Sequence, residues 1–512
     1  MTIIHSEFLP PHLYYAFPTT WLFTIIILIS ATAAVSYMGA VVIYRLYFHP
    51  LSHIPGPRLA AATHLYNFYY NGICSGRLYL QIEKLHRIYG PVIRISPAEI
   101  HLSDPENYDR IYRDGNGYAK PHSFYNTFLR GSLKVFTKPQ LGTCQAKHAN
   151  AAPPLFSPKH APELESIIQA KAGTLERRIR TRLRNVGKIN LHYAFRAMSV
   201  DIVTQYTSDG KGYGFLGRED FGKEYFVLAR QVARFVWAFQ QFPTLMGLLV
   251  RVVPVRGVRE LTRLLEQNGM RKGCFNPTLL EVDAVGGQDN EEGRSAIGYS
   301  KADVYDALAV VSHMAGNPLT ITAYNTVVNK EVYRMLKTEL TTAFPDPKSE
   351  PTFAELEKLP FLTAVIKEGF RLSYGMLGRL PRVIPEPGAE FNGYRVPAGS
   401  LVSMSSWVMH RNEELFPEPD EFDPSRWLGT RASSKNLEQY LVMFSKGSGQ
   451  CMGLPLAYCE MYIALARLFR HFNDLTIEPR GQEDPGYDDF FTPYHRPGKE
   501  IFCFAGSGCD QL

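Results

Sequence analysis

One long uncharged stretch near the N-terminus constrains the fold more than any other feature of this chain. From Phe8 to Tyr44 there is no Asp, Glu, Lys or Arg, and the part from 21 to 44 is strongly apolar. A helix rises about 1.5 Å per residue, so this part is long enough to cross a hydrocarbon core of ~30 Å. A secretory signal peptide would have a basic start and a shorter apolar run, whereas Glu7 precedes this one. The sequence therefore predicts a membrane anchor at 21–44 after a short segment at 1–20, with a buried core helix as the alternative.

Basic and proline-rich residues follow the apolar stretch. Arg45 and Arg58 lie on its C-terminal side, which favours a cytosolic position for the rest of the chain. Pro50 and the triplet 55–57 (Pro-Gly-Pro) fix backbone angles and remove hydrogen-bond donors. We therefore expect a stiff hinge at 45–60 that sets the orientation of the domain on the membrane.

The remaining residues, 61–512, have the composition of one large globular domain. Hydrophobic residues make up 45% of the 512-residue chain and charged residues 20%, so disorder is not the default interpretation. A net charge of +6 without a long Lys/Arg run gives no support for nucleic-acid binding. Seven cysteines without a CxxC pair argue against a disulfide framework and against a structural zinc site.

Helical periodicity dominates this domain, and the recognisable strands are short. The alternation of apolar and polar residues predicts a hairpin at 92–102, and short strands are expected at 380–402. Helices are expected at 162–184, 191–206, 221–240, 256–268, 301–340 with an interruption at Pro318, 361–373 and 454–472. The predicted fold class is mainly α with a small β region (α+β), because the strands are too clustered for alternating βαβ units.

A cysteine in a glycine-punctuated loop carries the strongest chemical signal. In the segment 444–453, Cys451 lies just before an apolar helix, between Gly447 and Gly453. Glycines allow tight turns and the close approach of a large flat group, and the start of a helix stabilises a thiolate. A thiolate is the axial donor that favours O–O cleavage at haem iron. The plainer alternative is a small buried cysteine, which is our interpretation of Cys459 in the following helix.

Two further segments argue against that plainer alternative. Glu368 and Arg371 lie three residues apart on a predicted helix, so they share a face and can pair. Arg426 lies in the proline-restricted loop 422–427. A buried glutamate between two arginines would hold this loop beneath a cofactor, although a single Glu–Arg pair on a surface is common.

In their order and spacing these segments resemble the cytochrome P-450 family, and the resemblance covers essentially the whole chain. The segments Tyr44–Pro57, 89–91 (Tyr-Gly-Pro), 104–105 (Asp-Pro) and 379–383 (Arg-Leu-Pro-Arg-Val) are similar to the fungal trichodiene-oxygenase-like branch. The resemblance implies the cytochrome P450 fold, preceded by a transmembrane helix. It also implies a single-pass protein of the endoplasmic reticulum membrane whose catalytic domain, 61–512, faces the cytosol.

The same resemblance implies a role for individual residues. Cys451 would be the axial ligand of the iron of haem b. The residues that contact the haem would be Arg382, His410, Phe444, Gly447 and Gly453, and the structural triad would be Glu368, Arg371 and Arg426. Electrons would come from NADPH through NADPH–cytochrome P450 reductase, and Lys446 would help to dock this partner.

The chain departs from the family pattern on the distal side of the expected haem. Where the family has an acid and an alcohol that deliver protons to dioxygen, this chain has Pro318 and Leu319. Pro318 should free the carbonyl of Met314 and kink the helix. Thr320, Asn317 or a hydroxyl of the substrate could hold the needed water instead. The alternative is a tolerated variant of an ordinary monooxygenase.

Two positions at which the family has cations that contact the cofactor also differ in this chain. Gly449 stands where an arginine that faces a propionate is usual, and 148–150 (His-Ala-Asn) stands where paired arginines are common. His148 could donate one hydrogen bond to a propionate, or it could be a loop histidine without a cofactor contact. Loss of one buried charge-assisted hydrogen bond costs roughly 1.5–3 kcal/mol, so haem would be held less tightly without being lost.

By the same resemblance, the segments that face the substrate are approximately 118–137 and 232–256. The second contains aromatic and aliphatic residues such as Trp237 and Phe242, which are plain core in one interpretation and enter the membrane in another. Either interpretation suggests an apolar substrate that enters from the bilayer.

The resulting hypothesis is a haem-dependent monooxygenase that hydroxylates or epoxidises an apolar small molecule. By resemblance to the fungal branch, the substrate would be a secondary metabolite such as a terpenoid or polyketide. The expected partners are the reductase, the substrate and membrane lipid, with no nucleic acid. The departure at 318–319 leaves open a haem-thiolate isomerase, a dehydratase or a peroxide-using enzyme, and the weakened propionate contacts leave open a degraded haem-binding paralogue.

Overall fold

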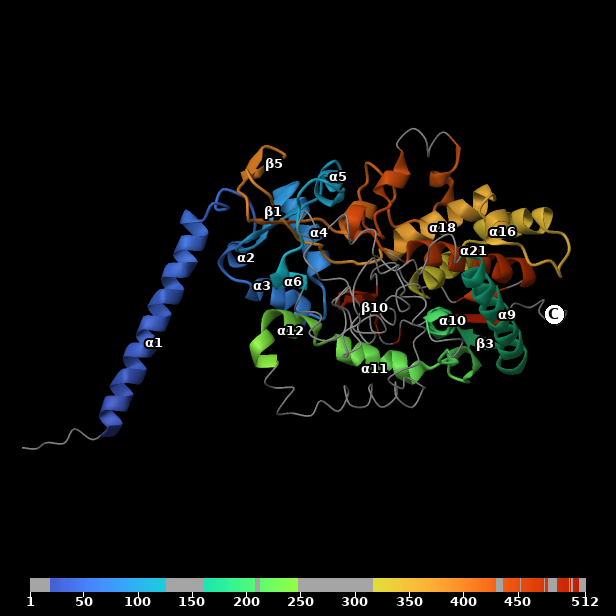
Figure 1. The fold of residues 1–512 in the computed structure, drawn as a ribbon, viewed down its shortest axis with the longest axis horizontal. Coiled ribbons are helices and arrows are strands. Elements are labelled where there is room, and N and C mark those ends of the chain that lie inside the picture. The colour runs from blue at the N-terminus through green and yellow to red at the C-terminus, as the bar shows by residue number, and fades with distance from the viewer. Residues whose placement is uncertain are drawn as a thin grey trace, which may run out of the picture.

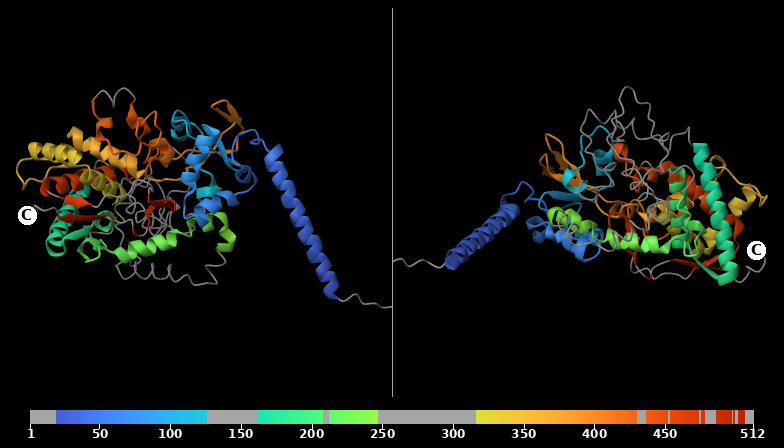
Figure 2. Two further views of the ribbon diagram at one scale, coloured as in Figure 1. Left: turned by 180° about the vertical axis from the view of Figure 1, so that it is seen from behind. Right: turned by 60° about the horizontal axis from the view of Figure 1, so that its bottom comes forward.

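The computed structural model describes residues 19–125, 161–207, 212–246, 316–429, 436–451, 453–473, 475–477, 486–496, 498 and 501–505. In this part of the chain, helices form most of a broad body, and one long helix projects from it (Figures 1 and 2). The strands are short and gather in small sheets. The predicted class, mainly α with a small β region, is confirmed.

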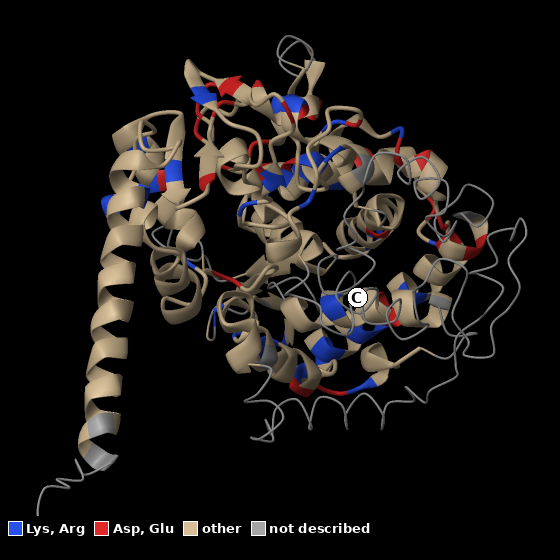
Figure 3. Ribbon diagram, turned by 60° about the vertical axis from the view of Figure 1, so that its left-hand side comes forward, with Lys and Arg blue, Asp and Glu red and all other residues tan. Residues whose placement is uncertain are grey.

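The projecting helix is α1 (Thr19–Ile43), which continues into a short π-helix, η1 (Tyr44–Phe48). Its residues from Phe23 to Phe48 are long and apolar enough to cross a membrane, and none of their most apolar stretch is buried against the body. Figure 3 shows no charged residue along α1. An apolar helix that nothing in the described protein covers is unlike a core helix, which would be buried.

The hinge after η1 is fastened to the first sheet by Arg94, whose side chain is almost fully buried. The Arg94 guanidinium donates from Nη1 to the Arg45 carbonyl over 2.9 Å and from Nη2 to the Pro97 carbonyl over 2.7 Å. Its backbone N–H donates to the Pro55 carbonyl over 2.7 Å. Because Leu51 in the same hinge is fully buried, this connector is part of the folded body.

Helices cover both ends of the body, as Figure 1 shows. Those between the hinge and residue 125 are α2 (Arg58–Ala62), α3 (Leu65–Phe68), η2 (Tyr69–Ile73), α4 (Leu78–Tyr89), α5 (Asn107–Tyr112) and α6 (His122–Tyr125). Those that follow are α9 (Ala161–Val186), α10 (Leu191–Thr207), η5 (Phe215–Gly217), α11 (Lys223–Ala233), α12 (Val236–Gln241), an unlabelled helical segment at 316–328, α16 (Lys330–Ala343), α17 (Phe353–Leu356), α18 (Pro360–Ser373), α19 (Ser406–His410), η7 (Pro424–Trp427), η8 (Leu437–Tyr440), η9 (Gly447–Gly449) and α21 (Leu454–His471).

The largest sheet has the strand order β1-β2-β7-β4. Its strands are β1 (Val92–Ser96), β2 (Glu99–Leu102), β7 (Leu401–Ser403) and β4 (Arg382–Val383). The smaller sheets are β3-β11-β8, β5-β6 and β9-β10, formed by β3 (Lys188–Asn190), β5 (Ala389–Phe391), β6 (Tyr394–Val396), β8 (Leu475–Ile477), β9 (Tyr487–Asp489), β10 (Pro493–His495) and β11 (Phe502–Ala505).

The hairpin of β1 and β2 is buried on both faces because two different layers cover it. Successive side chains of a strand point to opposite faces. Ile93 and Ile95 pack against α4, whereas Val92 packs with the hinge residues Leu51 and Ile54. The antiparallel pairing of β1 with β2 confirms the predicted hairpin at 92–102.

The main core lies where α9, α10, α16, α18 and α21 meet, at the end of the body away from α1 (Figure 1). Leu164, Ile168, Leu175, Ile179 and Leu183 recur at helical spacing along α9, so they form one apolar stripe that faces this core. α21 has core neighbours around most of its circumference, and this helix directly follows the cysteine loop.

Some predicted elements differ in the structure. The helix expected at 221–240 is divided into α11 and α12 at residues 234–235. In the segment expected at 301–340, the described helix includes Pro318 at its start and ends at 328, where Asn329 caps α16 by accepting a hydrogen bond from the Val332 N–H over 3.2 Å. The expected helix at 256–268 and the carbonyl of Met314 lie outside the described residues.

Candidate functional site

The loop that carries Cys451 is held by its own backbone. The Cys451 N–H donates to the Phe444 carbonyl over 2.8 Å, and the Gln450 N–H donates to the Gly447 carbonyl over 2.9 Å. Gly447 has a φ of +63°, and a Cβ there would lie 2.6 Å from the carbonyl oxygen of Tyr112. Only glycine fits this position, because both the left-handed backbone and the close approach exclude a side chain.

Two opposing effects act on the Cys451 thiol. Burial raises its pKa, and a hydrogen bond from the backbone of Gly453 lowers it by less. Gly453 is the N-cap of α21, so the sulfur lies at the positive end of that helix as the sequence predicted. The effect of burial is the larger of the two, so in the protein alone the thiol keeps its proton. A metal ion that binds the sulfur must displace this proton.

Phe444 joins this loop to two helices. Its ring lies 5.1 Å from that of Phe370 on α18 and 6.1 Å from that of Tyr458 on α21, measured between centroids. The first pair is edge-on and the second is tilted, and aromatic pairs at these separations are attractive beyond their buried area. The loop is therefore supported from the two helices that also carry Glu368 and the residues that follow Cys451.

The structure brings Glu368, Arg371 and Arg426 together in the interior. Arg371 donates from Nη2 to Glu368 Oε1 over 2.7 Å and from Nε to Oε2 over 2.9 Å. Arg426 approaches Oε1 with its Nε at 3.3 Å. Glu368 and Arg371 have no exposed side-chain surface, and Arg426 is 7% exposed, so this is a buried network and not a surface pair.

Two further donors to Glu368 were not predicted from the sequence. The Trp427 indole donates from Nε1 to Oε2 over 2.9 Å, and the Asp423 N–H donates to Oε1 over 3.0 Å. The position of Trp427 directly after Arg426 was the one available hint. Arg371 also contacts the loop at 419–427, which we call the meander. Its guanidinium donates to the carbonyls of Pro419 and Glu421 over 2.7 and 2.9 Å.

His410, which the resemblance places in contact with the haem, has partners within the protein for both ring nitrogens. Its Nδ1 donates to the Arg371 carbonyl over 2.8 Å, and its Nε2 accepts from the Val442 N–H over 3.0 Å. Both ring nitrogens are therefore used inside the fold. Burial, with a smaller contribution from Arg371, lowers the pKa of His410 to about 3, so this imidazole is neutral and links α18 to the segment that leads into the cysteine loop.

Arg382 remains available for an anion. It is 6% exposed, its guanidinium packs over the Tyr112 ring at 5.5 Å, and its Nε has no hydrogen-bond partner in the described part of the chain. A buried cation without a hydrogen-bonded partner is costly unless a ligand completes it. The orphaned Nε of Arg382 and the sulfur of Cys451 together fit a carboxylate-bearing metal cofactor such as haem.

On the helical segment 316–328, the two candidate distal residues already have partners. Thr320 donates from Oγ1 to the Gly316 carbonyl over 2.6 Å, and Asn317 is hydrogen-bonded through Oδ1 to Nε2 of His495 over 2.8 Å. Leu319 points into the main core and is fully buried. The hydrogen bond between Asn317 and His495 was not predicted.

The two segments expected to face the substrate meet in one aromatic cluster. It contains Phe124 and Tyr125 from the first segment, Trp237 from the second, and Phe490 from the loop between β9 and β10. The Trp237 indole donates to the Asp489 carbonyl over 2.6 Å, which ties α12 to this hairpin. The involvement of the C-terminal hairpin was not predicted.

Lys446 forms an ion pair with Asp109 and lies over the Tyr108 ring, 5.8 Å from its centroid. This lysine therefore fastens the cysteine loop to α5. His148 lies outside the described residues.

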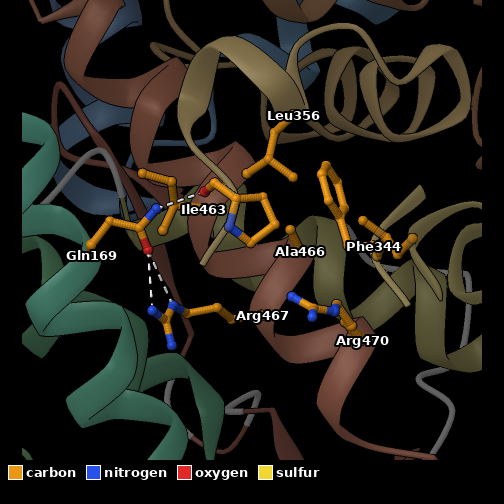
Figure 4. A pocket seen from close by; sticks show the side chains of 9 residues that line it. Gln169, Phe344, Leu356, Ile463, Ala466, Arg467 and Arg470 are labelled. Atoms are coloured by element: carbon orange, nitrogen blue, oxygen red, sulfur yellow. Dashed lines mark hydrogen bonds between the residues drawn. The ribbon is translucent and has the colours of Figure 1, made fainter. Parts of the chain in front are cut away.

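Two hollows in the described part of the chain lie away from Cys451. Figure 4 shows a cavity of about 10 Å³ beside α9, α16, α17 and α21, where Arg467 donates to Gln169 Oε1 over 3.2 Å. This volume holds no more than one water molecule. An open cleft of about 530 Å³ lies between the hinge and the β5–β6 hairpin, lined among others by Pro50, Arg110 and Arg395.

A mostly helical body with a cysteine loop docked on a buried helix is the arrangement of haem-dependent oxidoreductases, and comparison with known proteins agrees. Residues 317–495 match the family model described as cytochrome P450. The chain is 32% identical over 482 residues to tryptophan 6-hydroxylase fscE of Fusarium equiseti, covering 88% of this chain and 91% of that relative. It is 32% identical over 463 residues to conidiogenone synthase PchP450 of Penicillium rubens, with coverage of 86% and 90%.

A third relative is the cytochrome P450 monooxygenase sdnE of Sordaria araneosa, 30% identical over 499 residues that cover 90% of this chain and 94% of the relative. The chain belongs to the cytochrome P450 family. The predicted resemblance and the monooxygenase class are therefore confirmed. Membership implies a haem cofactor and electrons supplied by a redox partner.

Proposed function

We propose that residues 61–512 form a catalytic domain that inserts one oxygen atom from dioxygen into an apolar small molecule, by hydroxylation or epoxidation. The observation that carries this proposal is the cysteine loop, which α18 and α21 hold rigidly above the buried Glu368 network. Haem b, held through the Cys451 sulfur, supplies the activation of dioxygen. NADPH–cytochrome P450 reductase supplies the electrons from NADPH.

The residues of this chain have separate tasks in that reaction. Glu368, Arg371 and Arg426 hold the meander and with it the loop that presents the sulfur. Arg382 binds a cofactor carboxylate through its guanidinium, whose Nε has no hydrogen-bond partner among the described residues. Thr320 and Asn317 orient a water for proton delivery, because each still has an oxygen able to accept a hydrogen bond.

The aromatic cluster of Phe124, Tyr125, Trp237 and Phe490 defines the kind of substrate. These aromatic side chains are buried, and such side chains exclude water and contact hydrocarbon. Relatives that include a conidiogenone synthase support a secondary metabolite, and a terpenoid or polyketide skeleton fits such a cluster.

We also propose that α1 anchors the protein in the endoplasmic reticulum membrane, with the catalytic domain in the cytosol. An exposed apolar surface on the neighbouring helices supports membrane contact: Leu59, Leu65, Ile73, Phe235 and Leu245 are each about half exposed or more. The ring of Phe68 lies 5.1 Å from that of Phe242, which joins α3 to the chain after α12. An apolar substrate could enter from lipid through this surface.

The test uses the purified full-length chain with haem, reductase, NADPH and candidate metabolites from its native source. We expect a thiolate-type spectrum of the reduced carbon-monoxide complex and product formation that requires both NADPH and oxygen. Cys451→Ser should abolish both, and Cys459→Ser, a change in the buried cysteine of α21, should abolish neither. A Soret band and activity that survive Cys451→Ser would contradict the proposal.

One observation favours a second candidate, a haem-thiolate isomerase or dehydratase. Pro318 and the core-facing Leu319 occupy the positions at which the family holds its proton-delivering pair. Product formation in the absence of oxygen would select this second reaction over oxygen insertion.

A further inference from the structure

The open cleft of about 530 Å³ lies between the hinge and the β5–β6 hairpin, and the hinge residue Pro50 lines it. His53 of the hinge, which also lines the cleft, donates from Nε2 to the Arg395 carbonyl over 3.1 Å. Its ring stacks on that of Tyr394, with 6.3 Å between the centroids. These contacts connect the two walls, so the cleft is built into the fold on this side of the body.

Two opposite charges line this cleft without pairing. Glu390 on β5 and Arg395 on β6 lie directly across from each other in the antiparallel register, and both line the cleft. The Cβ atoms of such a pair are about 4.5–5.5 Å apart on one face, so an ion pair is within reach. Neither the Glu390 carboxylate nor the Arg395 guanidinium has a hydrogen bond or an ion pair with another described residue. The hairpin therefore presents one free anion and one free cation side by side.

A second guanidinium adds positive charge to the same cleft. Arg110 donates from Nη1 to the Glu390 carbonyl over 2.6 Å and lies over the Phe391 ring, 4.8 Å from its centroid. Both of these partners are neutral, so they fix the position of Arg110 without cancelling its charge. The lining thus offers two guanidinium groups, whose geometry suits a phosphate, and one carboxylate, which suits an ammonium group.

The cleft lies close to the end of the apolar stretch that includes α1. This stretch ends at Phe48, and Tyr44, Tyr47 and Phe48 are each more than half exposed, as suits aromatic residues at a membrane–water interface. Pro50 follows after two residues, or at most about 7 Å of extended chain, and a headgroup layer is about 5–7 Å thick. Figure 1 shows β5 beside the hinge end of α1. With α1 across a bilayer, the cleft therefore lies at the depth of the lipid headgroups.

We propose that this cleft binds the zwitterionic headgroup of phosphatidylethanolamine, with the phosphate against Arg395 and Arg110 and the ammonium against Glu390. The inference rests on the membrane anchoring that forms part of the proposed function. The ammonium of ethanolamine donates hydrogen bonds to a carboxylate, whereas the trimethylammonium of choline has no N–H to donate, so Glu390 distinguishes the two lipids. A bound lipid gives the body a second attachment to the membrane surface beside α1.

The experiment uses native mass spectrometry of the full-length protein in nonionic detergent, with equal amounts of dioleoylphosphatidylethanolamine and dioleoylphosphatidylcholine added. We expect the ethanolamine lipid to bind roughly threefold to fivefold more tightly, as one partly exposed charged contact allows. Glu390→Gln should remove most of this preference. Arg395→Gln should weaken both lipids by about the same factor, because the phosphate is common to both.

Glu331→Gln and Arg334→Gln are the matched controls. They neutralise the two members of an exposed ion pair on α16, which lies far from α1 in Figure 1. Neither control should change the affinity for either lipid. Far-UV circular dichroism of each variant checks that the fold is intact.

Three results would overturn the inference. The first is equal binding of the two lipids by the unchanged protein, and the second is a preference that survives Glu390→Gln. The third is binding of glycerophosphoethanolamine as tightly as the whole lipid, which would show a site for a soluble zwitterion.

Flotation of the protein with vesicles of phosphatidylcholine tests the anchoring separately. A protein that does not float would refute the proposed anchoring, and the lipid occupant with it. A protein that floats and oxidises its substrate but binds both lipids equally would lose only this inference.

Discussion

Trp427 donates its indole N–H to Oε2 of Glu368 over 2.9 Å, although 59 positions separate the two residues in the chain. With Arg371, Arg426 and the backbone of Asp423, this bond fills the hydrogen-bonding capacity of a carboxylate that has no exposed surface. The meander at 419–427 is thus fastened to α18 through one side chain. A charge in this position stabilises the fold only while all of its partners remain.

Replacing Glu368 by Gln removes the negative charge and leaves two buried arginines without compensation. We expect a loss of about 3–5 kcal/mol in the free energy of unfolding, measured by urea denaturation. Glu331→Gln is the control, because Glu331 pairs with Arg334 at the surface, where both side chains are more than 60% exposed. Equal effects of the two changes would contradict a buried role for Glu368.

Gly369 permits the close crossing of α18 and the helical segment 316–328. A Cβ at position 369 would collide with the Thr322 hydroxyl, which is itself bonded to the Pro318 carbonyl over 2.7 Å. Gly369→Ala should therefore destabilise the protein by about 1–3 kcal/mol in thermal unfolding. Gly173→Ala in α9 meets nothing closer than 3.5 Å, and we expect it to stabilise by about 0.5–1 kcal/mol through helix propensity. Stabilisation by both changes would show that the two helices do not approach this closely.

Replacement of the two neighbouring aspartates in β9 should have opposite effects on stability at pH 8. Burial raises the pKa of Asp489 to about 7 from its usual value of 3.8. Between these values the folded state keeps a proton that the unfolded state releases, so stability falls as the pH rises through this range. Asp489→Asn removes this pH-dependent loss of stability. It should stabilise the protein at pH 8 by on the order of 2 kcal/mol, with little effect at pH 4.

Asp488 is the matched control for Asp489. It forms ion pairs with Arg230 and, over 3.2 Å, with Arg496. Asp488→Asn should destabilise the protein at pH 8, where Asp489→Asn stabilises it. Free energies of unfolding at pH 4, 6 and 8 check both, and a stabilising effect of Asp489→Asn that is independent of pH would contradict the assignment.

His410 should make the protein sensitive to acid. The pKa of His410 is 6.5 in the unfolded chain and about 3 in the folded protein. Between these pH values the unfolded state binds a proton and the folded state does not. Stability is therefore full above pH 6.5 and is lost as the pH falls towards 3, by at most about 1.4 kcal/mol per pH unit. His410→Phe should be less stable at pH 7 but have a flatter pH profile. Urea denaturation at pH 4, 5, 6 and 7 measures both proteins, and equal slopes for His410→Phe and the unchanged protein would contradict this assignment.

Local patterns in the sequence were sufficient for much of this architecture. The alternation at 92–102 predicted the β1–β2 hairpin, and the three-residue spacing of Glu368 and Arg371 predicted their pairing, because both depend on neighbours along the chain. The roles of Trp427 and His410 depend on which distant backbone groups come within reach, and no periodicity encodes that.

The hydrogen bonds from Arg94 to the hinge restrict the orientation of the body relative to α1. A flexible tether would let an anchored domain present every face in turn, and each encounter with an electron donor would begin with a rotational search. Here one guanidinium donates to the carbonyls of both Arg45 and Pro97 and so connects the end of the projecting helix to the first sheet. Under the proposed anchoring of α1 in a membrane, this connection would restrict the orientations in which a redox partner meets the protein.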